Sequence, residues 1–299
     1  MRTTVDVIGV GGAGGFLASS LLQSSMPPRI ISRGAALQRL RDVGLTTIVD
    51  GKRRIYTPVE CASLDDVQEF APLIILTTKS YDLTALLEEI APRITEETLL
   101  VSIQNGFAAY DAICANFGTR QAAMGVLYVS AQIIAPGVID IKPGIAQLFL
   151  PEQHAAELED LVDALDTAGV EAALVDDIER RMWLKQIFLV PFAIVNAEMH
   201  QPIGKVLQNP QARQRWLALA RELVAIARAC DIRLPDDTAA ISLTKGDRFD
   251  PQADTSFARD VWANRPNEAE ALFAPLIQRA HKHNVSCPLL KQAYDHYHA

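Results

Sequence analysis

The chain is poor in aromatic side chains, in cysteine and in long apolar runs. Aromatic residues make up 6% of its 299 residues, and its four cysteines are scattered with no CxxC pair. The longest apolar run, Ile187 to Val195, is interrupted by Pro191 and is far shorter than the roughly 20 residues that span a bilayer. Scattered thiols are typical of a reducing compartment, and their spacing fits neither a disulfide scaffold nor a zinc site. Since Met1 to Asp6 lead into a strand pattern and not into an apolar signal segment, we expect a soluble, cytoplasmic protein.

Basic side chains are the minority. The 28 Lys and Arg residues stand against 36 Asp and Glu residues, which gives a formal net charge of −8. A polyanion binds to a positive field, so this balance argues against nucleic acid and anionic lipid as partners. A small anionic ligand stays compatible with it, because such a ligand needs only a few well-placed cations. The six histidines show no convincing metal-ligand context, so we predict no metal.

The apolar content is nonetheless high, at 49%, and the length suggests two domains. From residue 5 to about 176, short β-branched and aliphatic runs alternate with helical stretches. The runs expected to form strands are Val5 to Val10, Arg29 to Ser32, Leu73 to Thr77, Leu99 to Ile103, Ala123 to Tyr128 and Ala172 to Val175. Such alternation predicts a doubly wound parallel sheet with helices on both faces. The segment Val138 to Leu150, with turns at Pro136-Gly137 and Pro143-Gly144, is expected to add a hairpin.

The pattern changes after about residue 176. The long segments that follow have helical periodicity, and they run over Glu179 to Met199, Pro210 to Cys230, Asp236 to Leu243 and Asn267 to His283. No strand pattern occurs in this half. We therefore predict an α/β domain over residues 1–176 and an all-helical domain over residues 177–299.

The first strand runs into a glycine-rich turn that opens a helix. Its residues form a GxGxxG pattern: Gly9, Val10, Gly11, Gly12, Ala13 and Gly14. Gly9 suits the tight turn, Gly11 lets a pyrophosphate approach the backbone, and Gly14 lets helix and strand pack closely. The N-terminus of the helix, at Gly12 and Ala13, would then offer N–H groups to the phosphates. The motif alone is weak, but its place between a strand and an amphipathic helix predicts a dinucleotide site rather than a structural turn.

The residues at the end of the second strand indicate which dinucleotide the site binds. A site for NAD usually has an acidic residue there for the ribose 2′-hydroxyl, whereas a 2′-phosphate is bound by a cation. The chain has Ser32-Arg33-Gly34 and no acidic residue until Asp42. An arginine can bind phosphate in a bidentate manner. NADP is therefore favoured, with a solvated Arg33 as the alternative.

Several further blocks follow in a fixed order, and together they resemble the ketopantoate reductase (2-dehydropantoate 2-reductase) family. They are the glycine motif, Arg33, Thr77-Thr78-Lys79-Ser80-Tyr81, Ile103-Gln104-Asn105-Gly106, Met182-Trp183-Leu184-Lys185, Arg221-Glu222-Leu223, and Thr255-Ser256 through Arg265-Pro266-Asn267-Glu268. The resemblance covers nearly the whole chain. It implies a Rossmann-type domain followed by a helical domain like the C-terminal domain of 6-phosphogluconate dehydrogenase.

The resemblance also implies an activity, which is the NADPH-dependent reduction of a 2-oxo acid to a 2-hydroxy acid in a cleft between the two domains. In the family the substrate is ketopantoate and the product pantoate, a step of pantothenate biosynthesis, and we expect a homodimer. Matched position by position, Lys185 is the catalytic lysine, and Glu268 and Ser256 contact the substrate. Asn105 lies near nicotinamide and substrate, and Lys79 near the cofactor phosphates.

The residue types suit that chemistry in their own right. Reduction of a ketone leaves negative charge on oxygen, which the ammonium of Lys185 can neutralise by donating a proton. Glu268 can accept hydrogen bonds from substrate hydroxyl groups, whereas a neutral donor such as Ser256 or Asn105 suits a substrate carboxylate better. The plainer alternatives are a solvated Lys185, a first-turn helix acid at Glu268 with Asn267 as its cap, and a helix N-cap at Ser256.

The chain departs from the family at two positions. The family usually has asparagines four and eight residues after the catalytic lysine, whereas this chain has Leu189 and Ala193. Asn196 lies within about 20° of the same helical face and is a candidate substitute, one or two turns further along. Pro191 is expected to kink the helix. A less polar 2-oxo acid is therefore an alternative substrate, and a sensor that binds NADP(H) without turnover is a second alternative.

Overall fold

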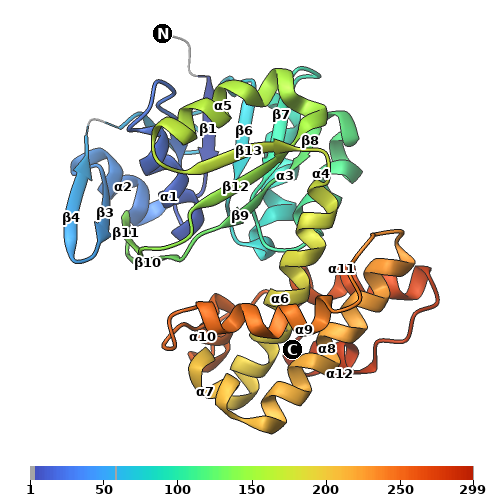
Figure 1. Cartoon of the computed structure of the whole chain (residues 1–299). Helices are drawn as coiled ribbons and strands as arrows, with labels where there is room; N and C mark the ends of the chain where they lie inside the picture. Colours follow the sequence, from blue (N-terminus) through green and yellow to red (C-terminus); the bar gives the residue numbers. More distant parts are fainter. Residues whose placement is uncertain (1–3, 58, 299) are drawn as a thin grey trace. The chain divides into compact units, whose positions relative to one another are not determined.

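The computed structural model describes residues 4–57 and 59–298, and its residues cluster into two compact units (Figure 1). Unit 1 comprises residues 1–104 and 109–178, and unit 2 comprises residues 105–108 and 179–299. The short segment 105–108 is thus packed with the second unit, although it lies in the sequence between a strand and a helix of the first. Among the described residues, no helix combines the length and the apolar character needed to span a membrane.

Unit 1 is built on a six-stranded sheet. The strand order is β5-β2-β1-β6-β7-β8, and every pair is parallel. The bounds are β1 Val5–Ile8, β2 Arg29–Ile31, β5 Cys61–Ala62, β6 Leu73–Leu76, β7 Leu99–Ser102 and β8 Ala122–Met124. The order reverses beside β1, which has β2 on one side and β6 on the other. This confirms the predicted doubly wound α/β fold.

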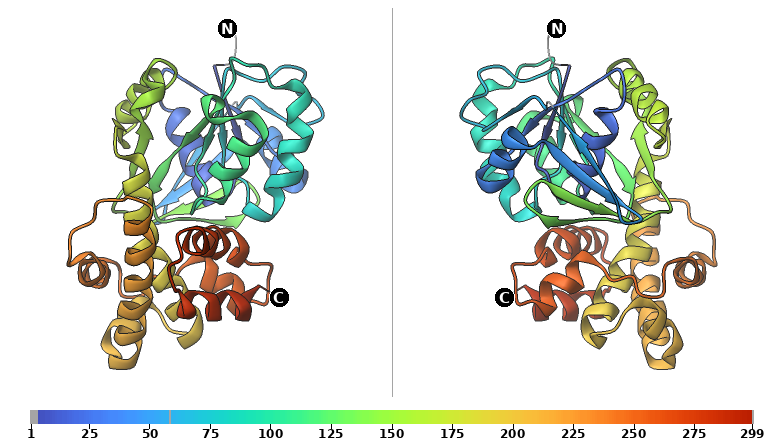
Figure 2. Two further views of the ribbon diagram at one scale, coloured as in Figure 1. Left: turned by 90° about the vertical axis from the view of Figure 1, so that its right-hand side faces the viewer. Right: turned by 90° about the vertical axis from the view of Figure 1, so that its left-hand side faces the viewer.

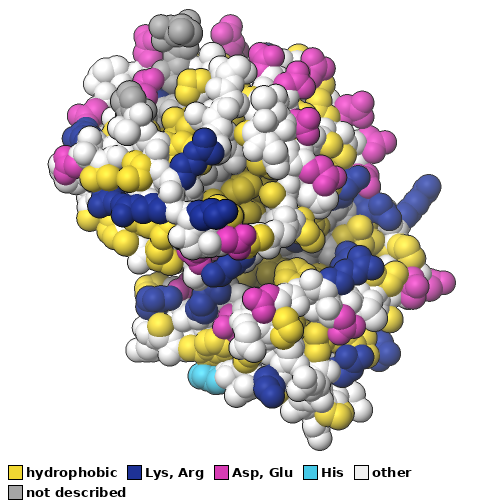
Figure 3. All heavy atoms as spheres, turned by 60° about the vertical axis from the view of Figure 1, so that its left-hand side comes forward, with side chains coloured by type: hydrophobic (Ala, Val, Ile, Leu, Met, Phe, Trp, Pro, Cys, Tyr) yellow, Lys and Arg dark blue, Asp and Glu magenta, His cyan; other side chains and the backbone are white. Residues whose placement is uncertain are grey.

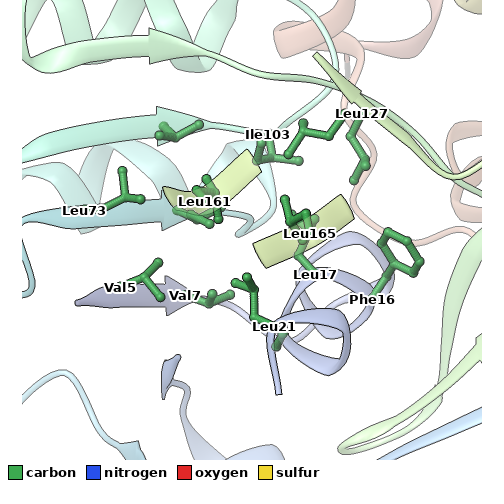
Figure 4. Packing of buried hydrophobic residues seen from close by; sticks show 14 of the residues in the cluster. Val5, Val7, Phe16, Leu17, Leu21, Leu73, Ile103, Leu127, Leu161 and Leu165 are labelled. Carbon is green, nitrogen blue, oxygen red and sulfur yellow. The ribbon is translucent and has the colours of Figure 1, made fainter. Parts of the chain in front are cut away.

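Helices cover both faces of this sheet (Figures 1 and 2). They are α1 Gly12–Leu21, α2 Gly34–Asp42, α3 Leu83–Ile90, α4 Ala108–Phe117 and α5 Ala155–Thr167. One buried cluster joins alternate strand residues to α1 and α5, and a second joins the other strand residues to α3 and α4. Figure 4 shows Leu17 and Leu21 of α1 and Leu161 and Leu165 of α5 among the strand side chains. Because both faces are buried, the strands are continuous aliphatic runs instead of alternating ones.

The additional strands form two smaller sheets, and here one sequence prediction is wrong. The strands β10 Ala131–Ala135 and β11 Val138–Ile141 pair as a hairpin and join β3 Leu45–Val49 and β4 Lys52–Tyr56. The strands β12 Gln147–Pro151, β9 Val126–Tyr128 and β13 Glu171–Val175 form the other sheet. The expected hairpin over Val138 to Leu150 therefore does not exist, because β11 and β12 pair with strands of different sheets.

Unit 2 consists of helices joined by loops, with no strand among its described residues. Its helices are α6 Ile178–Met199, α7 Ile203–Gln208, α8 Pro210–Ala229, α9 Thr238–Lys245, α10 Ser256–Trp262, α11 Ala269–Lys282 and α12 Pro288–Tyr297. Glu222 of α8 accepts hydrogen bonds from the backbone N–H groups of Leu289 and Leu290, so it caps the first turn of α12. The predicted all-helical second half is confirmed.

Helix α6 continues through Pro191. A proline inside a helix removes the hydrogen bond to the carbonyl four residues earlier, which is that of Ile187. The Ser242 hydroxyl of α9 donates to this carbonyl at 3.0 Å and accepts from Trp216 Nε1 at 2.9 Å. The carbonyl that the proline leaves free is thereby satisfied inside the core.

Candidate active site

The glycine turn after β1 has the geometry of a phosphate-binding turn. Gly9 has φ of +102°, a left-handed value that favours glycine. A side chain at Gly14 would overlap Thr77 Oγ1 and the Gly9 carbonyl, and one at Gly12 would overlap the Ala131 backbone. A Cβ at Gly11 would meet nothing within 4 Å, and no side chain caps the first turn of α1. The turn thus leaves space and N–H donors where a pyrophosphate is expected to approach.

Arg33 follows β2 and is largely exposed. Its guanidinium forms an ion pair at 2.8 Å with Asp82, which lies in the one-turn 3₁₀ helix Ser80–Asp82 after β6. Asp82 is a residue that sequence reasoning missed, because it is near Arg33 only through the pairing of β2 and β6 with opposite edges of β1. Lys79 precedes this turn and is half-buried.

The ends of β6 and β7 carry polar side chains. Thr77 donates to the backbone carbonyls of Ile8 and Gly9 and so ties β6 to the glycine turn. Thr78 Oγ1 and both polar side-chain atoms of Gln104 are buried and have no hydrogen-bonding partner in the part of the chain that the structure describes. Unpartnered buried polar groups are rare, and they lie here at the edge where doubly wound sheets bind ligands. These groups and the glycine turn fit a dinucleotide.

Lys185 lies in α6 of unit 2 with only 8% of its surface exposed. Burial lowers its pKa to about 8, because removal from water disfavours the charged ammonium. The plainer alternative of a solvated lysine is therefore wrong. One and two turns further along α6 come Leu189, which is half-buried, and Ala193, which is fully buried. The face of α6 that bears the ammonium is otherwise apolar at these two positions.

The segment Asn105–Ala108 is packed onto α6 and α11 of the same unit. The Phe107 ring is 1% exposed and lies 5.0 Å from the ring of Trp183, and the Arg279 guanidinium lies 4.3 Å from the Phe107 ring centre. Gly106 has φ of +86°, and a Cβ there would lie 3.2 Å from the Ala271 carbonyl oxygen. These contacts hold half-buried Asn105 in the same compact unit as Lys185.

Two further candidates lie at the starts of helices in unit 2. Ser256 is the exposed first residue of α10, and the N-cap is its neighbour Thr255, whose hydroxyl accepts from the Ala258 N–H at 3.0 Å. Ser256 therefore has no capping role. Glu268 is half-buried at the N-cap position of α11, where Asn267 accepts from the Ala269 N–H at 2.9 Å. Asn267 supplies the cap, so the Glu268 carboxylate is not needed for it.

Asn196 requires a correction. Its side chain is fully buried, and its amide group donates to the Gln201 carbonyl at 2.7 Å and to Asp254 at 3.2 Å. Its oxygen accepts from the N–H and the hydroxyl of Thr255 at 2.8 and 3.0 Å. Both donors and both acceptor positions are in use, so Asn196 holds the start of α10 and has no capacity left for a substrate.

The described residues provide little for metal or thiol chemistry. No group of three or more His, Cys, Asp and Glu side chains there is placed to hold a metal ion. The four cysteines are free and half-buried, and burial raises the pKa of each thiol. On the face drawn in Figure 3, acidic and basic side chains are interspersed with hydrophobic ones.

Comparisons with known proteins agree with these observations. Two family models match the chain, "Ketopantoate reductase PanE/ApbA" over residues 5–152 and its C-terminal counterpart over residues 177–299. A 2-dehydropantoate 2-reductase of Mesorhizobium japonicum is 26% identical over 292 residues, which span 90% of this chain and 88% of the relative.

Two solved structures share the fold. One is D-mandelate dehydrogenase with NADH and anilino(oxo)acetate, with a TM-score of 0.88 and 20% identity over 98% of this chain and 97% of that one. The other is a dimeric ketopantoate reductase of Staphylococcus aureus, with a TM-score of 0.83 and 21% identity over the same shares. With both halves matched by the family models, the chain belongs to the ketopantoate reductase PanE/ApbA family and is a dinucleotide-binding oxidoreductase of the type that acts on CH–OH groups.

Proposed function

We propose that the protein uses NADPH to reduce a 2-oxo acid to a 2-hydroxy acid, with Lys185 as the proton donor. The observation that carries this proposal is the buried Lys185 ammonium, whose pKa is lowered to about 8, in a chain that also has the glycine turn after β1. A lysine with an ordinary pKa is a weak acid near neutral pH, whereas this one is closer to the value at which general acids work best.

The chemistry divides between the bound cofactor and the chain. The reduced nicotinamide, when bound, supplies the hydride that adds to the ketone carbon. As the carbonyl electron pair moves to oxygen, Lys185 Nζ donates a proton to that oxygen and becomes a neutral amine. Burial favours this step, because the ammonium loses its charge in surroundings that disfavour charge. The amine then regains a proton from water before the next turnover.

The remaining site residues would hold the substrate. Ser256 and Asn105 carry neutral donors suited to a substrate carboxylate, and Ser256 is exposed with its hydroxyl not used as the helix cap. Glu268 would accept from a substrate hydroxyl group. Asn105 belongs to the same compact unit as Lys185, because Phe107 anchors its segment on α6.

For the cofactor, we propose that Arg33 binds the 2′-phosphate of NADPH and that Lys79 lies near the phosphates. The Arg33 side chain is 84% exposed and so is accessible, although it is paired with Asp82. Arg33→Ala is expected to weaken NADPH binding by about 10- to 100-fold, since charge-assisted hydrogen bonds are lost, and to leave NADH binding nearly unchanged. Asp82→Asn should improve NADPH binding, because it removes a competing carboxylate. Equal losses for the two cofactors in Arg33→Ala would rule out the phosphate role.

The substrate we propose first is 2-dehydropantoate, the substrate in the name of the Mesorhizobium japonicum relative. A less polar 2-oxo acid is the second candidate, and a specific observation favours it: Leu189 and Ala193 on the Lys185 face of α6 cannot hydrogen-bond a substrate hydroxyl group. The fold is also that of a D-mandelate dehydrogenase solved with anilino(oxo)acetate, an aromatic 2-oxo compound.

The test is a steady-state assay of NADPH oxidation with 2-dehydropantoate and with branched and aromatic 2-oxo acids. We expect turnover with at least one of them, and Lys185→Ala should lower kcat by about 100-fold or more while NADPH affinity is retained. NADPH binding without turnover of any 2-oxo acid would instead support the sensor. We also propose a homodimer, as described for the Staphylococcus aureus structure, and light scattering would test it.

A further inference from the structure

Two side chains with buried polar atoms, Thr78 and Gln104, lie at equivalent positions beyond adjacent strands. Leu76 of β6 pairs with Ser102 of β7, and Thr78 and Gln104 each lie two residues further along. Gln104 is 8% exposed, and neither its Nε2 nor its Oε1 has a hydrogen-bonding partner among the described residues. The Thr78 hydroxyl is likewise buried and unpartnered there. None of the roles assigned above uses either side chain.

Burial of such polar atoms costs free energy unless they find a hydrogen-bonding partner. A carboxamide buried without hydrogen bonds forfeits its hydration, and it regains that free energy from a group that both donates and accepts. Gln104 is also the last residue of unit 1 before the segment that belongs to unit 2. Its side chain thus belongs to the sheet that carries the glycine turn, and not to the unit of Lys185.

The position in the sheet indicates which part of a dinucleotide lies near. A dinucleotide crosses a doubly wound sheet at the point where the strand order reverses, with one nucleotide on each half. The glycine turn follows β1 and Arg33 follows β2, which places the adenosine end over the β1–β2 half. The β6–β7 half, with Thr78 and Gln104, is left for the nicotinamide nucleotide.

We propose that Gln104 forms a reciprocal pair of hydrogen bonds with the nicotinamide carboxamide, and that the Thr78 hydroxyl binds the adjoining ribose. A primary carboxamide offers one carbonyl oxygen and one NH₂ group, which complement the Nε2 donor and Oε1 acceptor of Gln104. The pairing would fix the rotation of the nicotinamide ring and so which of its two C4 hydrogens points toward the substrate. This inference rests on the proposed use of NADPH.

The experiment compares NADPH with its 3-acetylpyridine analogue, in which a methyl group replaces the NH₂ of the carboxamide. Calorimetric titration of the wild-type protein should give NADPH an advantage of about tenfold over the analogue. Gln104→Met, which keeps the side-chain length and removes both polar atoms, should weaken NADPH by about tenfold and weaken the analogue less, because the analogue keeps the carbonyl that accepts from Nε2 but has no NH₂ to donate to Oε1. Thr78→Val should weaken NADPH and the analogue equally, because both carry the ribose.

Controls separate this inference from the proposed function. Adenosine 2′,5′-bisphosphate, which lacks the nicotinamide half, should bind Gln104→Met as it binds the wild type and should bind Arg33→Ala more weakly. Equal losses of NADPH and analogue in Gln104→Met, or no loss of either, would overturn the Gln104 pairing while leaving the reductase intact. A wild-type protein that binds no NADPH would overturn both. Should Gln104→Met fail to fold by circular dichroism, Gln104→Leu tests the same point, since it also removes both polar atoms.

Discussion

Lys185 combines a buried position with a pKa of about 8, and a rate measurement can detect this directly. With Lys185 as the proposed proton donor, reduction needs the protonated amine, so kcat for the 2-oxo acid should be constant below pH 8 and fall about tenfold per pH unit above it. Oxidation of the 2-hydroxy acid needs the neutral amine and should rise with pH up to the same value. Steady-state kinetics in both directions measure this. Lys185→Arg should lose the alkaline limb, and a limb that persists in that variant would belong to another group.

The same residue makes a prediction about stability. Its folded-state pKa lies below the ordinary value of 10.5, so folding disfavours the ammonium, and this cost is fully present below about pH 8. The cost diminishes as pH rises from about 8 to 10.5, where the unfolded chain binds the proton and the folded chain does not. Lys185→Met should therefore raise the free energy of unfolding at pH 7 by about 1–3 kcal/mol. Urea titrations at pH 7 and pH 10 should show that this gain shrinks at the higher pH.

Asn196 shows what the sequence alone could not reveal about single residues. The helical period correctly places it within about 20° of the Lys185 face. Its contacts, however, come from Gln201, Asp254 and Thr255, and the last two lie almost 60 residues along the chain. Periodicity describes a helix face but not the segment that packs on it. The catalytic role of Lys185, in contrast, stays a prediction that rests on the neighbouring residues of the family block.

At the scale of the helix, α6 owes its continuity at Pro191 to Ser242. Ser242→Ala should cost about 2–3 kcal/mol, because the Ile187 carbonyl and the Trp216 N–H both lose their partner in the core. Pro191→Ala restores a backbone N–H that can bond to the Ile187 carbonyl within the helix. In that background, Ser242→Ala should cost about 1 kcal/mol less. Guanidinium unfolding of the two single variants and the double variant measures the coupling, and strictly additive costs would refute the compensation.

The segment 105–108 makes a second prediction at this scale. Phe107→Ala removes a ring packed between Trp183 and Arg279 and should cost about 3–5 kcal/mol. Amide hydrogen exchange of residues 105–108 should rise and kcat should fall, with NADPH affinity nearly unchanged because the glycine turn lies in unit 1. Phe192→Ala, which removes a buried ring stacked on Trp216, is the matched control. It should destabilise the protein without raising exchange in residues 105–108.

For the whole molecule, the sequence predicted the architecture better than the connections within it. The parallel sheet and the helical half follow from repeated local patterns, since most of the buried strands are largely aliphatic and helices such as α8 and α11 have a 3.6-residue period. The hairpin over Val138 to Leu150 failed because the partner of each strand is set by distant segments. The packing of residues 105–108 with unit 2 was not predicted for the same reason, since their contacts are with distant segments. Its signal is present in the sequence only as the two aromatic residues Phe107 and Trp183.

Substrate preference is a property of the whole molecule, and substitutions in α6 can test it. If Leu189 and Ala193 face the substrate, the wild-type protein should prefer apolar branched or aromatic 2-oxo acids to the hydroxylated 2-dehydropantoate. Leu189→Asn together with Ala193→Asn would supply amide groups at both positions and should raise kcat/KM for 2-dehydropantoate relative to an aromatic 2-oxo acid by about tenfold or more. Leu189→Met with Ala193 unchanged is the control, because it alters shape without polarity. Equal specificity ratios in the wild type, the double variant and the control would show that the substrate does not contact these positions. A substrate in contact with them would respond to the two new amide donors.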